Sequence, residues 1–398
     1  MRTNSIASSA NRFALAALIS LSLFSCNRFW SVAESYGYCR DFNFGLSPGM
    51  AAPQHPQGNC VTEQKVALGR RLFYDRRLSE NQKQSCSSCH IQRLGFSDGR
   101  VRAIGSTGET HPRNALTLAN IANFSTLTWF SPDVVRLENQ TLIPFFAVSS
   151  QTTILELGIT GKEHVIIERI QQDAVYPRMF EEAFPGSPVD ISHVARALEA
   201  FEMTLLSYKS PFDLGKMSEP AKRGEKVFYS ERGGCFHCHG GRDFNLDDRE
   251  NRLSFQNIGL YNVHGSGDYP DQMLHGDAAQ KSVQGLFLIT GKKEDRGRFR
   301  TPSLRNIEVS APYMHDGSVA SLAGVIEIFN EGGRNVRWGP LAGDGRKNPE
   351  KDSRVRPLGL SEEEKSDLIA FLLSLTDENF LNDSRFSDPA VTASFIRD

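Results

Sequence analysis

Two short cysteine motifs constrain this chain of 398 residues more than any other feature. Each consists of two cysteines and a directly following histidine: Cys86, Cys89 and His90 in the first, and Cys235, Cys238 and His239 in the second. A zinc knuckle, a redox-active dithiol and a covalently attached c-type haem can each use such a stretch. These three chemistries differ in the number of ligands that they need and in the use that they make of the histidine.

The spacing of the motifs favours haem. A structural zinc site usually takes four ligands from closely placed pairs, whereas these motifs lie about 150 residues apart. A thioredoxin-like dithiol has no use for the histidine. Covalent haem explains all three positions, because the thiols add to the vinyl groups and the histidine reaches the iron. We therefore expect one haem c on each motif, with His90 and His239 as iron ligands.

The sequence around the motifs occurs twice. Residues 68–90 (LGRRLFYDRRLSENQKQSCSSCH) and 223–239 (RGEKVFYSERGGCFHCH) each contain a Gly-x-x-aliphatic-Phe-Tyr segment, a polar turn and then the motif. A repeat at this separation indicates two homologous domains, each built around one motif.

Helical periodicity dominates the rest of the chain. Apolar residues recur at helical spacing over 190–207 behind a capping Asp190, and residues 210–213 (SPFD) interrupt that helix. A Ser-x-x-Glu capping box, Ser361 with Glu364, begins a helix over 360–375. Strand-like alternation is scarce. We expect a mainly α fold with two cytochrome c-like helical domains, 61–211 and 212–380, after a tether over 26–60 and before a tail over 381–398.

The first 25 residues have the features of a signal peptide. Residues 13–24 are almost wholly apolar and follow two arginines, but they are too few to span a bilayer. The following LFSC resembles a lipobox with Cys26 as the lipidated residue, although Phe24 is bulky for that motif and ordinary cleavage nearby stays open. We expect an exported, periplasmic protein that is anchored to the outer membrane through a lipid on Cys26.

Cys39 and Cys60 remain after the other cysteines are assigned. In an exported protein, two such cysteines in one segment most simply form a disulfide, with two free buried thiols as the alternative. The 45 basic and 47 acidic side chains give a net charge of -2 without a basic stripe. We therefore expect no nucleic-acid partner.

Several further stretches resemble the bacterial di-haem cytochrome c peroxidase and MauG superfamily over residues 60–385. They include HPRNALTLAN, TWFSPDVVRLENQTLIP, GRFRTPSLRNIEVSAPYMHDGSVASL and SLTDENFLND. TGETHPRN, ELGITG and FQNIGLYN look like the MbnH branch, whose members oxidise a tryptophan in a partner protein. The resemblance makes 61–211 the peroxidatic domain and 212–380 the electron-transfer domain.

The resemblance also implies the residues that act at haem 1. Gln140 and Pro144 match the distal loop of the family, and Glu156 matches its catalytic glutamate, although the loop between them is longer here. Trp129 matches the tryptophan that lies between the haems. His111 does not match the histidine that closes haem 1 in relatives, so we expect a five-coordinate haem 1 and a loop or propionate-contacting role for His111.

Two further sites follow from the same resemblance. Asn114, Ser310 and Pro312 match a calcium site between the domains, and oxygen donors of this kind suit calcium. Relatives supply Met or Tyr as the second ligand of haem 2, but Phe329 stands at that position and has no lone pair. Haem 2 is then five-coordinate, or another group such as water or Met314 binds its iron.

Two function classes remain in competition. In the first, the chain is an enzyme that reduces hydrogen peroxide at haem 1 and withdraws electrons from a partner protein through haem 2. The partner is then a small cytochrome, a cupredoxin or an MbnP-like substrate protein. In the second, it is a di-haem electron carrier without peroxidase activity. Gln140, Glu156 and Trp129 favour the enzyme, because a carrier needs no acid–base groups.

Overall fold

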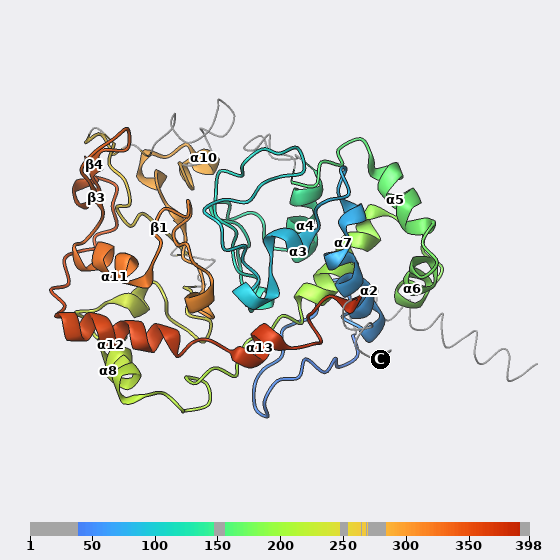
Figure 1. Cartoon of the computed structure of the whole chain (residues 1–398), viewed down its shortest axis with the longest axis horizontal. Coiled ribbons are helices and arrows are strands. Elements are labelled where there is room, and N and C mark those ends of the chain that lie inside the picture. The colour runs from blue at the N-terminus through green and yellow to red at the C-terminus, as the bar shows by residue number, and fades with distance from the viewer. Residues whose placement is uncertain are drawn as a thin grey trace, which may run out of the picture.

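The molecule consists of two helical lobes that lie side by side along its long axis (Figure 1). The computed structural model describes residues 39–146, 156–246, 254–263, 265–267, 269 and 284–390, so the predicted signal segment and Cys26 lie outside the described residues. The N-terminal lobe contains α2 (Glu63–Tyr74), α3 (Cys86–Cys89), α4 (Leu137–Phe145), α5 (Glu163–Gln171), α6 (Tyr176–Ala183) and α7 (Ile191–Glu202). The C-terminal lobe contains α8 (Glu219–Phe228), α10 (Phe287–Thr290), α11 (Leu322–Asn330) and α12 (Glu362–Leu373), and α13 (Glu378–Asn382) follows.

Strands are few and short in the described part of the chain. Two antiparallel pairs lie in the C-terminal lobe: β1 (Phe255–Gln256) with β2 (Phe299–Arg300), and β3 (Asn335–Val336) with β4 (Gly343–Asp344). The expectation of a mainly α fold is therefore confirmed.

The two helices that the sequence predicted most sharply are both present. Asp190 caps α7 by accepting a hydrogen bond from the backbone N–H of His193, 2.8 Å away. Ser361 and Glu364 form the reciprocal capping box of α12. Each cap satisfies backbone donors that would otherwise be unpaired at a helix start.

One glycine contact brings a pair of helices together in each lobe. In the N-terminal lobe α2 packs on α7 at Gly69, where a Cβ atom would lie 1.8 Å from the carbonyl oxygen of Ala197. In the C-terminal lobe α8 packs on α12 at Gly224, where a Cβ atom would lie 1.9 Å from the carbonyl oxygen of Asp367. Both are the glycine of the repeated Gly-x-x-aliphatic-Phe-Tyr segment, so the repeat preserves a close helix contact.

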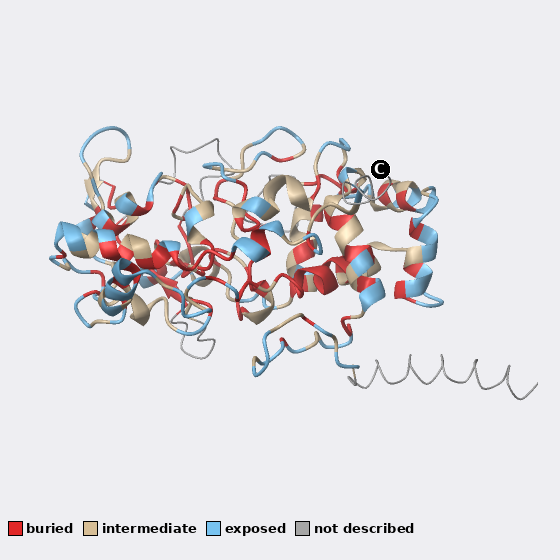
Figure 2. Cartoon of the chain, turned by 60° about the horizontal axis from the view of Figure 1, so that its bottom comes forward, coloured by how far each residue is buried: buried red, intermediate tan, exposed pale blue. Residues whose placement is uncertain are grey.

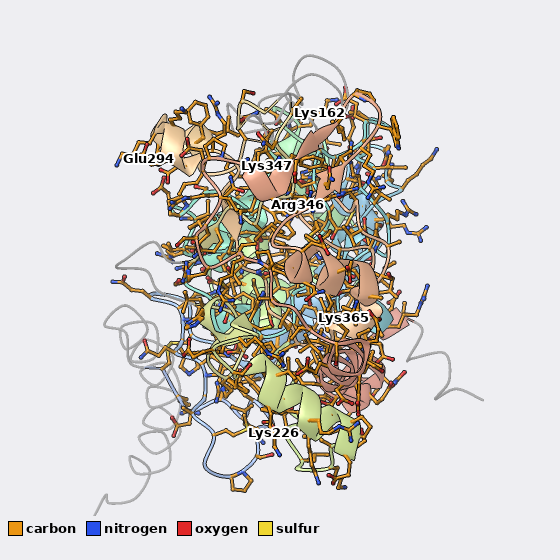
Figure 3. The ribbon with its side chains drawn as sticks, turned by 90° about the vertical axis from the view of Figure 1, so that its left-hand side faces the viewer. Lys162, Lys226, Glu294, Arg346, Lys347 and Lys365 are labelled. Atoms are coloured by element: carbon orange, nitrogen blue, oxygen red, sulfur yellow. A yellow bond between two sulfur atoms is a disulfide. The ribbon has the colours of Figure 1, made fainter. Side chains whose placement is uncertain are left out.

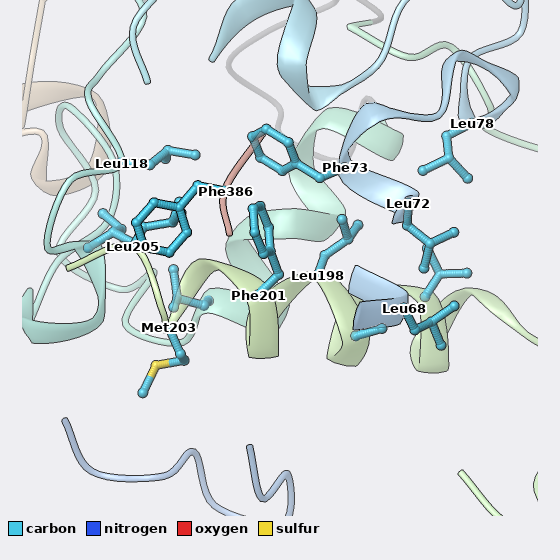
Figure 4. Close-up of a cluster of buried hydrophobic side chains, with 14 of the residues drawn as sticks. Leu68, Leu72, Phe73, Leu78, Leu118, Leu198, Phe201, Met203, Leu205 and Phe386 are labelled. Carbon is cyan, nitrogen blue, oxygen red and sulfur yellow. The ribbon is translucent and has the colours of Figure 1, made fainter. Parts of the chain in front are cut away.

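Equivalent aromatic pairs fill the cores beside these contacts. The ring of Phe73 on α2 lies 5.2 Å from that of Phe201 on α7, within the cluster that Figure 4 shows. The ring of Phe228 on α8 lies 5.0 Å from that of Phe371 on α12. Buried residues run through the middle of both lobes (Figure 2). Each motif therefore stands on its own apolar core.

Two asparagines with left-handed backbones join the lobes. The N–H of Asn120 donates to the carbonyl of Leu205 after α7 (2.8 Å), and that of Asn306 donates to the carbonyl of Leu375 after α12 (3.1 Å). Ser207, in the connection between the lobes, donates its N–H to Asn120 Oδ1 (2.6 Å) and accepts from Asn306 Nδ2 at its Oγ (2.9 Å). Ser207 therefore bonds to equivalent asparagines of the two lobes.

The chain after α12 returns to the N-terminal lobe. The ring of Phe380 on α13 lies 5.5 Å from that of Phe96. The hydroxyl of Tyr74 donates to the carbonyl of Phe386 (2.6 Å), and Gln92 Nε2 donates to the carbonyl of Asp383 (2.9 Å). Residues 380–386 therefore pack on the N-terminal lobe next to the first motif, and α13 lies between the lobes in Figure 1.

The segment before α2 also packs on the N-terminal lobe. Cys39 and Cys60 are joined by a disulfide. Asn59 donates from Nδ2 to the carbonyl of Arg196 on α7 (2.9 Å), and Phe44 is buried in the lobe's core. These contacts hold the segment against α7.

The far end of the C-terminal lobe carries charged side chains on several elements. Figure 3 shows Lys226 of α8, Lys365 of α12 and the neighbouring Arg346 and Lys347 on this end. Lys365 Nζ lies 2.9 Å from the carboxylate of Glu327, which joins α12 to α11. Within the described residues, no helix is both long and apolar enough to cross a membrane.

Candidate active site

The first motif forms a short helix whose histidine is fixed by a backbone carbonyl. His90 follows α3, and its Nδ1 lies 2.8 Å from the carbonyl oxygen of Phe96. Phe96 has a left-handed backbone (φ 62°), which turns its carbonyl toward the ring. With Nδ1–H donating to this oxygen, Nε2 keeps its lone pair for a metal, the arrangement expected of an iron-ligating histidine.

The second motif repeats this arrangement. His239 Nδ1 lies 3.0 Å from the carbonyl oxygen of Phe244, which also has a left-handed backbone (φ 50°). Burial lowers the pKa of both His90 and His239, which favours the neutral imidazole that binds iron. Both histidines therefore fit the role of an axial haem ligand.

The surroundings of the four motif cysteines fit covalent haem better than the alternatives. The described residues contain no group of three His, Cys, Asp or Glu side chains placed to hold a metal ion, as a zinc site would require. Neither motif forms a disulfide. Burial raises the pKa of all four thiols: Cys86, Cys89, Cys235 and Cys238.

A cavity opens beside the first motif and brings together the residues predicted for haem 1. Its empty volume is about 660 Å³ including its opening to solvent, within the usual range of cofactor sites. Its lining includes the first motif and all three residues of the predicted distal site: Cys86, Cys89, His90, Gln140, Pro144 and Glu156. Gln140 and Glu156 are far apart in the sequence, so their convergence on one cavity is a product of the fold.

α4 and a backbone hydrogen bond position the distal residues. α4 carries Gln140 in its first half and Pro144 one turn later, next to its last residue. The N–H of Leu157 donates to the carbonyl of Pro144 (2.9 Å), which brings Glu156 back to the helix after the longer loop. Residues 147–155 of that loop lie outside the described residues.

Glu156 is paired with His111 at the cavity wall. His111 Nε2 lies 3.2 Å from Glu156 Oε1. His111 Nδ1 lies 3.2 Å from the backbone nitrogen of Arg113 and 3.1 Å from its carbonyl oxygen, and these contacts hold the ring at the cavity wall. Burial raises the pKa of Glu156, but the hydrogen bond from His111 and the positive charge of Arg113 together hold it below the ordinary value of a glutamate. Glu156 is therefore a carboxylate at neutral pH.

The contact between His111 and Glu156 was not anticipated from the sequence, which suggested only a loop or propionate-contacting role. The two residues lie 45 positions apart, and no local pattern joins them. The nearest signal was their position in two stretches, TGETHPRN and ELGITG, that both carry the family resemblance.

Trp129 lies in a buried cluster at the contact between the lobes. Trp129 and Phe130 come from the N-terminal lobe and pack with Tyr261, Tyr269 and Phe299 of the C-terminal lobe. The indole Nε1–H of Trp129 donates to the carbonyl of Asn114 (2.8 Å). This burial and this bond hold the indole in place at the contact between the lobes.

The predicted calcium ligands lie near the same contact. The N–H of Asn114 donates to the carbonyl of His315 (2.8 Å), and Asn114 Nδ2 donates to the carbonyl of Arg100 (2.7 Å). His315 follows Pro312 closely, which places Asn114 against the loop that carries Ser310 and Pro312. Carbonyl and amide oxygens of this kind fit calcium in chemistry.

The residues considered for the surroundings of the second haem lie in the C-terminal lobe. Phe329 lies near the end of α11 and is partly buried. Met314 has a left-handed backbone (φ 75°) and touches both the C-terminal core and the cluster around Trp129. His315 is buried and stacked on Phe299, with ring centroids 3.6 Å apart.

Three further side chains line the cavity and were not predicted from the sequence: Gln84, Thr141 and Glu202. Each has a buried polar atom without a hydrogen-bond partner, which indicates that a bound group completes the site. The only sequence signal for Glu202 was its place on the apolar face of a predicted helix, where a glutamate is unusual.

Comparison with known proteins places the chain in a family. Residues 63–219 match the family model of di-haem cytochrome c peroxidase. The methylamine utilization protein MauG of Methylorubrum extorquens is 33% identical over 331 residues, 81% of each chain. The cytochrome c551 peroxidase of Pseudomonas aeruginosa is 30% identical over 281 residues, 69% of this chain and 73% of the relative.

A solved structure extends the likeness to the whole fold. The crystal structure of a MauG-like protein associated with microbial copper homeostasis is 42% identical, with a TM-score of 0.81. The match covers 88% of this chain and 100% of that one. This chain belongs to the di-haem cytochrome c peroxidase and MauG family of oxidoreductases.

Proposed function

We propose that the N-terminal lobe reduces hydrogen peroxide to water and that the C-terminal lobe passes in electrons from a partner protein. The observation that carries this proposal is the convergence of Gln140, Pro144 and Glu156 on the cavity of the first motif. A haem bound there through Cys86, Cys89 and His90 supplies an iron at which the oxygen–oxygen bond of peroxide is cleaved.

Glu156 and Gln140 have complementary roles in that cleavage. As a carboxylate, Glu156 takes the proton from the iron-side oxygen of peroxide and returns it to the outer oxygen, which departs as water. The Gln140 amide donates a hydrogen bond that orients the peroxide. His111 holds Glu156 in its ionised form through the 3.2 Å contact, so the base is ready before the substrate arrives.

The second lobe serves the first as an electron entry. Trp129, buried at the contact between the lobes, relays charge between them. Phe329, at the position where relatives supply a ligand, would offer no lone pair to a haem iron held by the second motif. Calcium held by Asn114, Ser310 and Pro312 stabilises the contact between the lobes.

The partner is a protein of the periplasm. A small cytochrome, a cupredoxin or a substrate protein that carries an oxidisable tryptophan can supply the electrons. The 42% identity to a MauG-like protein associated with microbial copper homeostasis favours a partner from a copper-handling system. The signal segment exports the chain, and a lipid on Cys26 anchors it to the outer membrane.

Turnover separates this function from that of a simple electron carrier. The di-haem holoprotein is mixed with hydrogen peroxide and a reduced small c-type cytochrome, and oxidation of the cytochrome is followed by absorbance. We expect oxidation that depends on peroxide, with two electrons taken for each peroxide consumed. If the protein exchanges electrons with the cytochrome at the same rate with and without peroxide, its function is that of an electron carrier.

A further inference from the structure

Three unpartnered polar atoms converge on the cavity of the first motif from separate parts of the chain. They are Oε1 of Gln84 before α3, Oγ1 of Thr141 on α4 and Oε2 of Glu202 at the end of α7. The exposed fractions of Thr141 and Glu202 are 4% and 5%. Buried polar atoms are nearly always paired, with protein or with water, so each of these atoms is a candidate partner for a water molecule in the cavity.

Two buried glutamates on α7 differ sharply in their partners. Glu199 accepts hydrogen bonds at both oxygens, from Asn59 Nδ2 (2.7 Å) and from the N–H of Glu138 (3.1 Å). Glu202, one turn later, has no partner at Oε2. An ionised carboxylate in that position would lose its hydration without compensation, which favours the neutral acid.

The charges around Glu202 also favour its neutral, protonated form. Burial, together with the charge of Glu199 on the same helix, raises the pKa of Glu202 to about 8. The other titratable groups that line the cavity are Cys86, Cys89, His90, His111 and Glu156. Glu156 is already paired with His111.

We propose that Glu202 is held as a neutral acid and, with Thr141, binds a water molecule through which it delivers a proton to the peroxide site. The inference rests on the proposed reduction of peroxide. That reaction breaks one oxygen–oxygen bond and forms two waters from one hydrogen peroxide, two electrons and two protons. The partner protein supplies the electrons.

The two carboxyl groups therefore have different tasks. Glu156 moves a proton between the two peroxide oxygens and adds none, so both protons that are consumed must enter from elsewhere. Glu202 supplies one of them and solvent supplies the other. The partly exposed Gln84 links the site to solvent, from which Glu202 recovers its proton.

Infrared difference spectroscopy tests the protonation directly. In the holoprotein at neutral pH, we expect the C=O stretch of a protonated carboxyl group, which disappears on titration to alkaline pH. The band is lost in Glu202→Gln. In Glu199→Gln, the matched control on the same helix, the band is kept but disappears at a lower pH than in the wild-type protein, because the charge of Glu199 no longer raises the pKa of Glu202. A wild-type protein without the band at neutral pH, or a band that survives in Glu202→Gln, would overturn the inference.

Peroxide kinetics test the delivery. In Glu202→Gln we expect peroxide reduction to slow about 100-fold at unchanged haem content, the scale of a lost acid–base group. Glu202→Asp, which keeps an acid, restores part of the rate. Wild-type turnover that is undiminished in Glu202→Gln would contradict this inference alone, whereas absence of turnover in the wild-type protein would contradict the proposed function.

Discussion

The two lobes share the helix contact and the backbone carbonyl that position a Cys-x-x-Cys-His motif. They differ in the side chains that lie beside the motif. Gly69 and Gly224 make the same helix contact, and the carbonyls of Phe96 and Phe244 fix the two motif histidines in the same way. Beside the first motif lies a cavity lined by Gln140, Glu156 and further polar side chains. Beside the second motif, apolar side chains of the C-terminal core pack against Cys235.

This difference teaches which residues serve attachment and which serve chemistry. Whatever is common to both lobes is sufficient to place a Cys-x-x-Cys-His motif and orient its histidine. Whatever occurs beside one motif only is a candidate for the reaction. The following predictions therefore change either a shared feature or a feature of one lobe.

The largest effect is expected from the shared glycines. In Gly69→Ala or Gly224→Ala, the new methyl group would meet a backbone carbonyl, at 1.8 Å or 1.9 Å from its oxygen. The helices must move apart, and we expect each variant to lose about 3 kcal/mol or more of unfolding free energy in denaturant titrations. Gly324→Ala on α11 is the control, because its nearest neighbour is a side-chain methyl at 3.1 Å. If Gly69→Ala and Gly224→Ala were as stable as Gly324→Ala, neither helix contact would depend on its glycine.

A smaller effect is expected from His111, a feature of the first lobe only. His111→Gln removes the contact that lowers the pKa of Glu156. The carboxylate exists above its pKa and is lost as pH falls through it, so the acid limb of the rate profile should move to higher pH. We expect about a 10-fold lower rate of peroxide reduction near pH 5. An unshifted acid limb would show that His111 does not control Glu156.

A substitution of Trp129 tests whether electrons pass between the lobes at their contact. Trp129→Phe keeps an aromatic ring in the buried cluster but removes the N–H that donates to the carbonyl of Asn114. We expect electron transfer between the haems, followed by rapid mixing, to slow several-fold while haem content stays constant. An unchanged rate would place the electron route elsewhere.

The substitution Phe329→Tyr is expected to change the ligation of the second haem iron. Of the substitutions considered, it should have the smallest effect on the rate of peroxide reduction. Phe329→Tyr offers a phenolic oxygen where the phenylalanine has no donor. Low-temperature EPR of the ferric variant should gain a six-coordinate signal that is absent from the wild-type protein. A wild-type second haem that is already fully low-spin and six-coordinate would mean that another group, such as Met314, binds the iron.

Local patterns were enough to predict one part of this molecule. The motifs, the Asp190 cap of α7 and the capping box at Ser361 depend on residues close in sequence, and all are present. The family resemblance identified Glu156 and Gln140, which line the same cavity. These predictions did not require knowing which segments of the chain contact one another in the fold.

Other features depend on contacts that no local pattern encodes. The carbonyls of Phe96 and Phe244 face the histidines only because both residues take a left-handed backbone, which is rare for phenylalanine. Glu202 lies on the apolar face of its helix, but its position beside the first motif depends on how α7 packs within the lobe. The pairing of His111 with Glu156 joins two separate loops and depends on the whole lobe.

The central claim is that Glu156 is the base that cleaves peroxide in the first lobe, and Glu156→Gln tests it most directly. Rapid mixing of the di-haem variant with hydrogen peroxide measures the rate of peroxide consumption, with the exposed Glu109→Gln as control. We predict a rate about 1,000-fold below that of the wild-type protein at unchanged haem content, within the range for loss of a general base, and a wild-type rate for the control. A Glu156→Gln variant that consumes peroxide as fast as the wild-type protein would contradict the account.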